Sequence, residues 1–136
     1  MDAELAFEVE RWLEKARDDL GVAQHLDELY HPKPVEIICF HCQQAAEKAI
    51  KAVILARGVQ EIPSADALSF LLHLLDGNIE RQLLAYADSL VRYTVDVCYP
   101  NDLHLEDSDC RTALYGAQQI LIWCEAQINL DKDSTQ

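Results

Sequence analysis

The sequence lacks several features that would assign it at once to a familiar functional class. No uninterrupted apolar run reaches the roughly 18 residues that a membrane-spanning helix needs, so we expect no transmembrane segment. The chain has only four glycines and none are clustered, which argues against a glycine-rich phosphate-binding loop. No Ser/His/Asp or Cys/His spacing typical of a nucleophilic site stands out. These absences argue against membrane proteins, P-loop enzymes and hydrolases with a nucleophilic triad.

Basic residues are also scarce. The chain has 11 lysines and arginines against 24 acidic residues, which gives a formal net charge of −13. This balance opposes strong unaided binding to DNA or RNA, because cationic side chains must displace the counterions of the phosphate backbone. The charge fits a basic protein partner, or simply a role in solubility, and any nucleotide or RNA contact would be confined to a local basic pocket. The acidic faces also argue against an anionic lipid surface, so no membrane partner is expected.

The five cysteines are an odd number, and their context favours a reducing compartment. The N-terminal stretch MDAELAFEVERW is acidic and lacks the basic and apolar regions of a secretory signal, so we expect a cytoplasmic protein without a disulfide framework. Cys39, His41 and Cys42 have a spacing that suits a shared metal, but no second pair completes four ligands. We therefore predict no metal and no cofactor, with Cys110 and Cys124 buried in the core.

Apolar residues recur at three-and-four spacing along most of the chain, which predicts helices, and no stretch alternates as a strand does. Prolines 32 and 34 end the first helix, and Gly58 is the expected C-cap of the second. The expected helices span residues 3–30, 35–57, 64–75, 79–97 and 108–129. The sequence therefore predicts an all-α, up-and-down four-helix bundle with one additional short helix. Residues 1–130 form a single domain in this interpretation, and residues 131–136 form a polar tail.

The stretch from Cys39 to Leu55 is the predicted central helix of this bundle. Its apolar stripe consists mostly of small residues, which let neighbouring helices approach closely; the stripe comprises Ile38, Cys42, Ala45, Ala49, Val53 and Ala56. A polar stripe of His41, Gln44, Lys48 and Lys51 follows the same spacing. This stripe either lines a groove that contacts a nucleotide or a partner, or faces solvent or a second protomer. Glu47 and Lys51, four residues apart, are expected to form an ion pair.

Several segments together resemble the HEPN (higher eukaryote and prokaryote nucleotide-binding) domain family. The first helix carries Trp12, Ala16, Asp19, Leu20 and Ala23 in the pattern W…A..DL..A. The segment FHCQQAAEKAIKAVIL follows a short proline loop, and it is the most specific part of the resemblance. The leucine-rich LSFLLHLL and a helix that ends in Tyr-Pro come next, in the family's order. The resemblance covers nearly the whole chain, from about residue 4 to residue 128.

The resemblance implies a helical bundle that forms a homodimer. Many small prokaryotic members of the family are encoded beside a minimal nucleotidyltransferase, in pairs described as toxin–antitoxin modules. The resemblance therefore implies a minimal nucleotidyltransferase as the partner. Other members are metal-independent ribonucleases, which carry a histidine four to six positions after an arginine at the end of a helix.

The sequence departs from this ribonuclease pattern. Arg92 has no histidine in the required window, and the next one, His104, lies twelve positions further on. Cys98-Tyr99-Pro100 stands where many nucleotidyltransferase-linked relatives have Arg-Tyr-Pro. Asp66-Ala67-Leu68 stands where relatives often have His-Asp-Leu. These changes remove groups that bind phosphate or transfer protons, so we predict a protein without ribonuclease activity.

Two alternative functions remain open from the sequence. One is a metal-independent ribonuclease toxin, in which Arg92 binds phosphate and His104 performs acid–base chemistry. The other is a nucleotide-binding adaptor module that uses the polar stripe of the central helix. Asp96 and Tyr99 are further candidates for ligand or partner contacts, although Arg92 and Asp96 are four residues apart and are alternatively expected to pair with each other.

Overall fold

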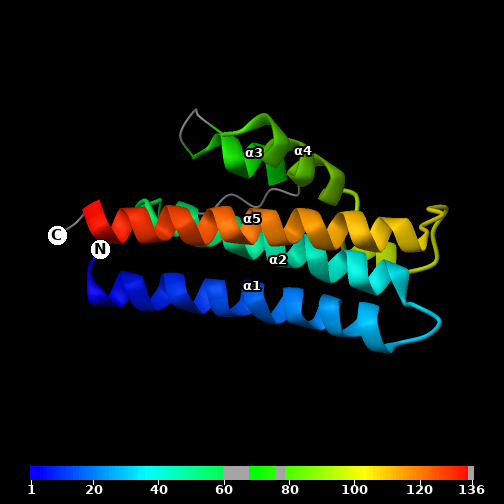
Figure 1. The fold of residues 1–136 in the computed structure, drawn as a ribbon. Helices are drawn as coiled ribbons and strands as arrows, with labels where there is room; N and C mark the ends of the chain where they lie inside the picture. Colours follow the sequence, from blue (N-terminus) through cyan, green and yellow to red (C-terminus); the bar gives the residue numbers. More distant parts are fainter. Residues whose placement is uncertain (60–67, 76–78, 135–136) are drawn as a thin grey trace.

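The computed structural model describes residues 1–59, 68–75 and 79–134, and every regular element in these ranges is helical (Figure 1). The elements are α1 (Ala3–Leu29), α2 (Val35–Ala56), α3 (Leu68–His73), α4 (Arg81–Leu90), the 3₁₀ helix η1 (Val95–Cys98) and α5 (Asp107–Ser134). The all-α prediction is thus confirmed. Within the same ranges, no helix combines the length and the apolar character that crossing a membrane requires.

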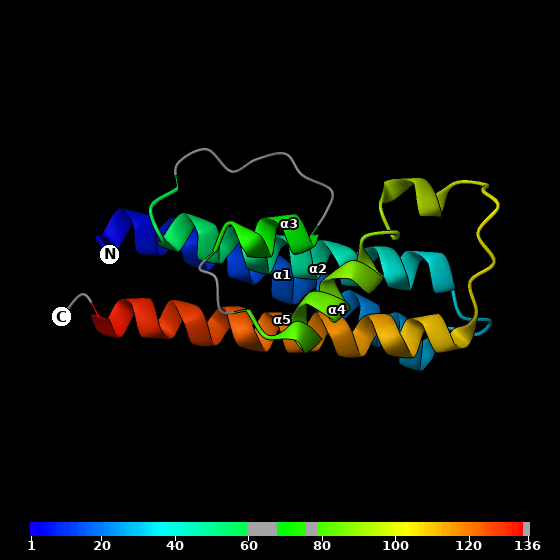
Figure 2. The same ribbon diagram turned by 90° about the horizontal axis from the view of Figure 1, so that it is seen from above.

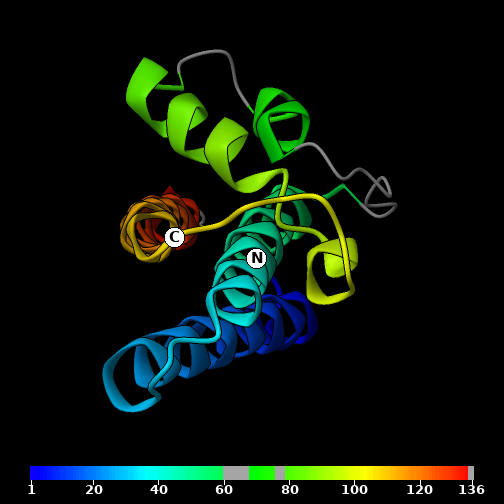
Figure 3. The ribbon, with the colours of Figure 1, turned by 90° about the vertical axis from the view of Figure 1, so that its right-hand side faces the viewer.

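The long helices α1, α2 and α5 lie side by side, and α1 runs in the opposite direction to the other two (Figure 1). On the face away from α1, α3 lies over α2 and α4 crosses obliquely over α5 (Figure 2). An end-on view places α2 in the middle, with α1, α5, η1 and the α3–α4 pair around it (Figure 3). This arrangement confirms the predicted four-helix bundle with one additional short helix.

The ends of α1 and α2 follow from local sequence. The Asp2 side chain caps α1 by accepting a hydrogen bond of 2.7 Å from the Leu5 N–H. Gly58 has a φ of 87°, a left-handed conformation that favours glycine. The Val59 N–H donates to the Ile54 carbonyl and the Gly58 N–H to the Leu55 carbonyl, which is the Schellman pattern of helix termination. The prediction of Gly58 as the cap of the second helix is confirmed.

The core is built around α2, which buries twelve of its 22 residues and is therefore enclosed on several sides. Ala45, Ala46, Ala49 and Ala52 are completely buried, so their small side chains allow the neighbouring helices to pack closely. Larger side chains such as Ile50 fill the space between these contacts. The predicted central, alanine-lined helix is confirmed.

The fourth helix is shorter than predicted. It ends at Leu90 rather than near Val97, and the chain continues through a turn into η1. Val91, Thr94 and Val95 are β-branched, which lowers the preference for a helix, and Thr94 is extended with a ψ of −179°. Tyr93 turns into the core and is only 4% exposed, so packing in this segment takes precedence over helical continuation.

The last helix is longer than predicted, because α5 continues beyond Asn129 to Ser134 and makes most of the expected polar tail helical. No glycine or proline stops it, and Lys132 in its last turn complements the helix dipole. Arg57 pairs with Asp131 at 3.6 Å and ties this end of α5 to the end of α2. The predicted start of the third helix at residue 64, and residues 76–78 before the predicted fourth helix, lie outside the described residues.

Candidate functional site

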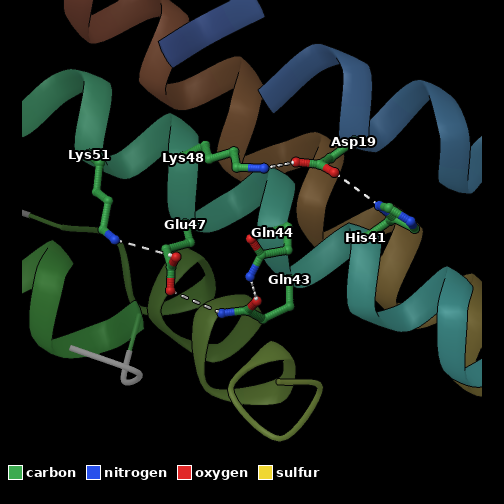
Figure 4. A network of polar contacts seen from close by, with 7 residues as sticks. All are labelled: Asp19, His41, Gln43, Gln44, Glu47, Lys48 and Lys51. Carbon is green, nitrogen blue, oxygen red and sulfur yellow. Dashed lines mark hydrogen bonds and ion pairs between the residues drawn. The ribbon is translucent and has the colours of Figure 1, made fainter. Parts of the chain in front are cut away.

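The polar stripe of α2 faces α1, where Asp19 contacts two of its members (Figure 4). One carboxylate oxygen of Asp19 lies 2.9 Å from Nδ1 of His41, and the other accepts a hydrogen bond from Nζ of Lys48. The Asp19 side chain is 13% exposed, while His41 and Lys48 are each 27% exposed. Asp19 therefore connects α1 to two side chains that lie two turns apart on α2, and His41 and Lys48 are half-buried rather than free in solvent.

Replacing Asp19 by alanine is expected to lower the free energy of unfolding by about 1 to 2 kcal/mol, because His41 and Lys48 lose their shared acceptor. Asp18→Ala is the matched control, since Asp18 is exposed and has no ion pair in the described chain. Its effect should stay within about 0.5 kcal/mol. Urea denaturation of both variants measures the difference; equal losses would show that the Asp19 bridge does not stabilise the α1–α2 pair.

A second set of polar contacts joins side chains along α2 itself. Gln44 donates to the Gln43 side-chain oxygen at 2.7 Å, and Gln43 donates to Glu47 at 3.3 Å (Figure 4). Glu47 also pairs with Lys51 at 3.4 Å, which confirms the predicted ion pair. Gln43 is only 1% exposed and was not among the predicted site residues. Its position on the core side of the helix could have indicated that it is buried. Gln44 thus has a partner on its own helix.

A groove of about 250 Å³ opens where the stripe meets α1, and it is lined by Glu8, Arg11, Trp12, Lys15 and Lys48. Arg11 pairs with Glu8 at 3.2 Å, and Nζ of Lys51 lies 6.0 Å from the centroid of the Trp12 ring. Lys15 forms no ion pair within the described chain. The groove therefore combines an aromatic surface with positive charge, in a chain that is acidic as a whole.

Arg92 is held by the beginning of α5. Its Nη2 atom lies 3.2 Å from an oxygen of Asp109, and its guanidinium carbon lies 5.2 Å from the Tyr93 ring centroid. The Tyr93 hydroxyl donates to the same oxygen of Asp109 at 3.1 Å, and burial raises the pKa of this tyrosine. The other oxygen of Asp109 accepts the Glu106 N–H at 2.7 Å, as an acidic residue does in the third position of a helix. The Asp109 carboxylate therefore accepts from three donors: the Arg92 guanidinium, the Tyr93 hydroxyl and the Glu106 N–H.

The remaining predicted site residues lie on the surface between η1 and α5. Asp96 is exposed and does not pair with Arg92, because α4 ends before Arg92 and the helical four-residue spacing is lost. His104 is exposed and makes no hydrogen bond or ion pair with any residue that the structure describes. Tyr99 is 66% exposed. The predicted pair of Arg92 and His104 therefore does not form a hydrogen-bonded unit.

Four of the five cysteines are buried, and only Cys98 is exposed. Cys39 and Cys42 lie in the core. Across the described ranges, no three side chains of His, Cys, Asp or Glu gather in a way that suits a metal ion.

Stability is expected to fall in alkaline solution. Burial raises the pKa of Cys39, Cys42 and Cys124 above the ordinary value of 9.0, to about 12 for Cys42. These thiols ionise in the unfolded chain before they ionise in the core, so their contribution is complete below the unfolded pKa and is lost as the pH rises toward the folded one. The loss should reach up to about 1.4 kcal/mol per pH unit for each thiol.

Urea denaturation at a series of pH values measures this fall, and Cys42→Ala should make it less steep. A wild-type stability that stays constant well above the ordinary thiol pKa would contradict the assignment of these cysteines to the core.

Comparison with known proteins assigns the chain to a class. The profile of the HEPN domain family matches residues 9–127, and the chain therefore belongs to this family. It is similar to the crystal structure of TT1696 from Thermus thermophilus, with 30% identity, a TM-score of 0.73, and coverage of 88% of this chain and 97% of that one. It is also similar to ST0689, an archaeal HEPN homologue, with 26% identity, a TM-score of 0.70 and the same coverage. No curated protein matches the chain.

Proposed function

We propose that this HEPN-domain protein acts in the cytoplasm as a homodimer that binds a minimal nucleotidyltransferase, in a toxin–antitoxin-like module, and that it does not cut RNA. The observation that carries the second part is the position of Arg92. Its guanidinium is engaged by Asp109 and Tyr93, and no histidine of the described chain pairs with it.

Ribonuclease chemistry without a metal needs an acid or base within hydrogen-bond reach of the reacting atoms. Positions four to six after Arg92 hold Asp96, Val97 and Cys98 instead of a histidine. Val97 carries no titratable group. Burial, and then the charge of Glu36, raise the pKa of Cys98, so this thiol stays protonated at neutral pH. These features favour a binding role over catalysis.

The protein-partner part of the proposal is supported by charge. The net charge of −13 favours association with a basic protein, because complementary fields accelerate encounter. Large apolar side chains remain exposed on α5 and around η1, and such side chains supply contact area in protein interfaces.

Co-purification with the product of a neighbouring nucleotidyltransferase gene tests this function. Size-exclusion chromatography with light scattering should show a dimer alone and a larger stoichiometric complex with the nucleotidyltransferase. A strictly monomeric protein that forms no complex at micromolar concentrations would overturn the proposal.

A second candidate function is nucleotide binding, which the groove beside Trp12 favours. An aromatic ring supplies a stacking surface, and Lys15 is a cation without an ion pair in the described chain. Calorimetry with ATP tests it: measurable heat that Lys15→Ala and Trp12→Ala both abolish would support this function. No heat at millimolar nucleotide would exclude it.

A further inference from the structure

A separate groove of about 400 Å³ lies between the start of α2 and the segment from Val97 to Leu103. Three of its side chains are apolar and largely exposed: Ile37 at 43%, Tyr99 at 66% and Leu103 at 43%. Exposed apolar side chains that share one concave surface are more typical of an interaction site than scattered ones. Neither the Asp19 bridge nor the groove beside Trp12 uses any of these residues.

The wall of this groove is organised by hydrogen bonds. The Asn101 amide nitrogen donates to the carbonyls of Val97 at 3.1 Å and Tyr99 at 2.7 Å, while its oxygen accepts the Leu103 N–H at 2.7 Å. The Tyr99 N–H donates to the Asp96 carbonyl at 3.2 Å. One side chain therefore fixes the loop that presents Tyr99 and Leu103, and a preformed surface loses less conformational entropy when it binds.

The charge of the groove is negative. Glu36, in the first turn of α2, is one of its lining residues, and none of the described residues that line it is a lysine, arginine or histidine. Asp102 is exposed within the Val97–Leu103 segment, and Asp96 is exposed directly before it. Glu36 is close enough to act on the Cys98 thiol, whose pKa it raises after burial does. The groove thus offers apolar contacts beside the Glu36 carboxylate, which no basic lining residue neutralises.

We propose that this groove binds a protein segment that places an apolar side chain next to a lysine or arginine. The apolar side chain packs against Ile37 and Leu103, and the cation lies near Glu36 and the face of the Tyr99 ring. The proposal rests on the proposed function only in taking the partner to be a protein, and it holds for any protein that carries such a segment.

Selection from a display library of random dodecapeptides against the full-length chain tests the groove directly. Enriched peptides should pair a basic residue with an adjacent apolar one, and a synthetic consensus peptide should bind about tenfold more weakly to Leu103→Ser. Glu36→Lys should weaken the same peptide by about tenfold and shift a repeated selection toward acidic peptides. Ile122→Ser is the matched control, because it removes an exposed apolar side chain from α5 and should leave binding unchanged.

Circular dichroism checks that each variant is folded. We expect all three to fold, because the substituted residues lie on the surface. Absence of enrichment, enrichment of acidic or purely apolar peptides, or equal binding by Leu103→Ser would overturn the proposal. If Leu103→Ser instead converts a wild-type dimer to a monomer, a second copy of the chain covers the groove and the proposal is wrong. The selection uses no nucleotidyltransferase, so failure to bind that enzyme and failure of the groove are distinguishable.

Discussion

Replacing Ile50 by alanine is expected to lower the free energy of unfolding by about 2 to 5 kcal/mol. Ile50 is completely buried on α2, the helix that the other long helices surround (Figure 3). The truncation removes buried apolar contacts and leaves a cavity that closely packed alanine positions on the same helix cannot fill by moving. Urea denaturation followed by circular dichroism measures the loss.

Ile122→Ala is the matched control for this prediction. It makes the same chemical change on α5 at a side chain that is 60% exposed, and its effect should stay within about 0.5 kcal/mol. Similar losses for the two variants would contradict the placement of α2 at the centre of the core.

Replacing Asp109 by alanine is expected to cost about 2 to 3 kcal/mol, the larger of the two polar substitutions that we propose. The change removes the shared acceptor of Arg92 and the Tyr93 hydroxyl, and it also removes the acceptor of the Glu106 N–H at the start of α5. The Tyr93 hydroxyl is part-buried and would lose its partner, which is the costly case for a hydrogen bond. Thermal and urea denaturation measure the effect.

Asp107→Ala provides the comparison, because Asp107 lies exposed in the same first turn and contributes mainly through the helix dipole. Its cost should stay below about 1 kcal/mol. If the two variants differ by less than about 0.5 kcal/mol in their free energy of unfolding, the contacts of Asp109 do not stabilise the packing of Arg92 and Tyr93 against the start of α5.

The regular parts of the fold follow from sequence because each is set by local chemistry. Apolar spacing predicted the helices, small residues predicted the crowded environment of α2, and Gly58 predicted the end of that helix. The end of α4 was not predictable in this way. Burial of Tyr93 and the contact of Arg92 with Asp109 join residues far apart in the sequence, and helix propensity is too weak to oppose such tertiary contacts.

In the candidate sites, too, local features were predictable from the sequence and tertiary contacts were not. Spacing placed His41, Gln44 and Lys48 on one face of a helix, but it did not identify Asp19 as the partner, because periodicity within one helix does not reveal what the next helix presents. The role of Gln43 was missed because glutamine is usually a surface residue. The predicted binding roles of Asp96 and Tyr99, and the alternative acid–base role of His104, stay predictions.

The most direct test of the central claim, that this HEPN domain binds rather than cuts, is incubation of the purified full-length protein with end-labelled RNA in the presence of EDTA. The RNA should remain intact, with wild type, Arg92→Ala and His104→Ala all indistinguishable from buffer. Cleavage by the wild-type protein that both substitutions abolish would contradict the account and assign the chain to the ribonuclease members of the family.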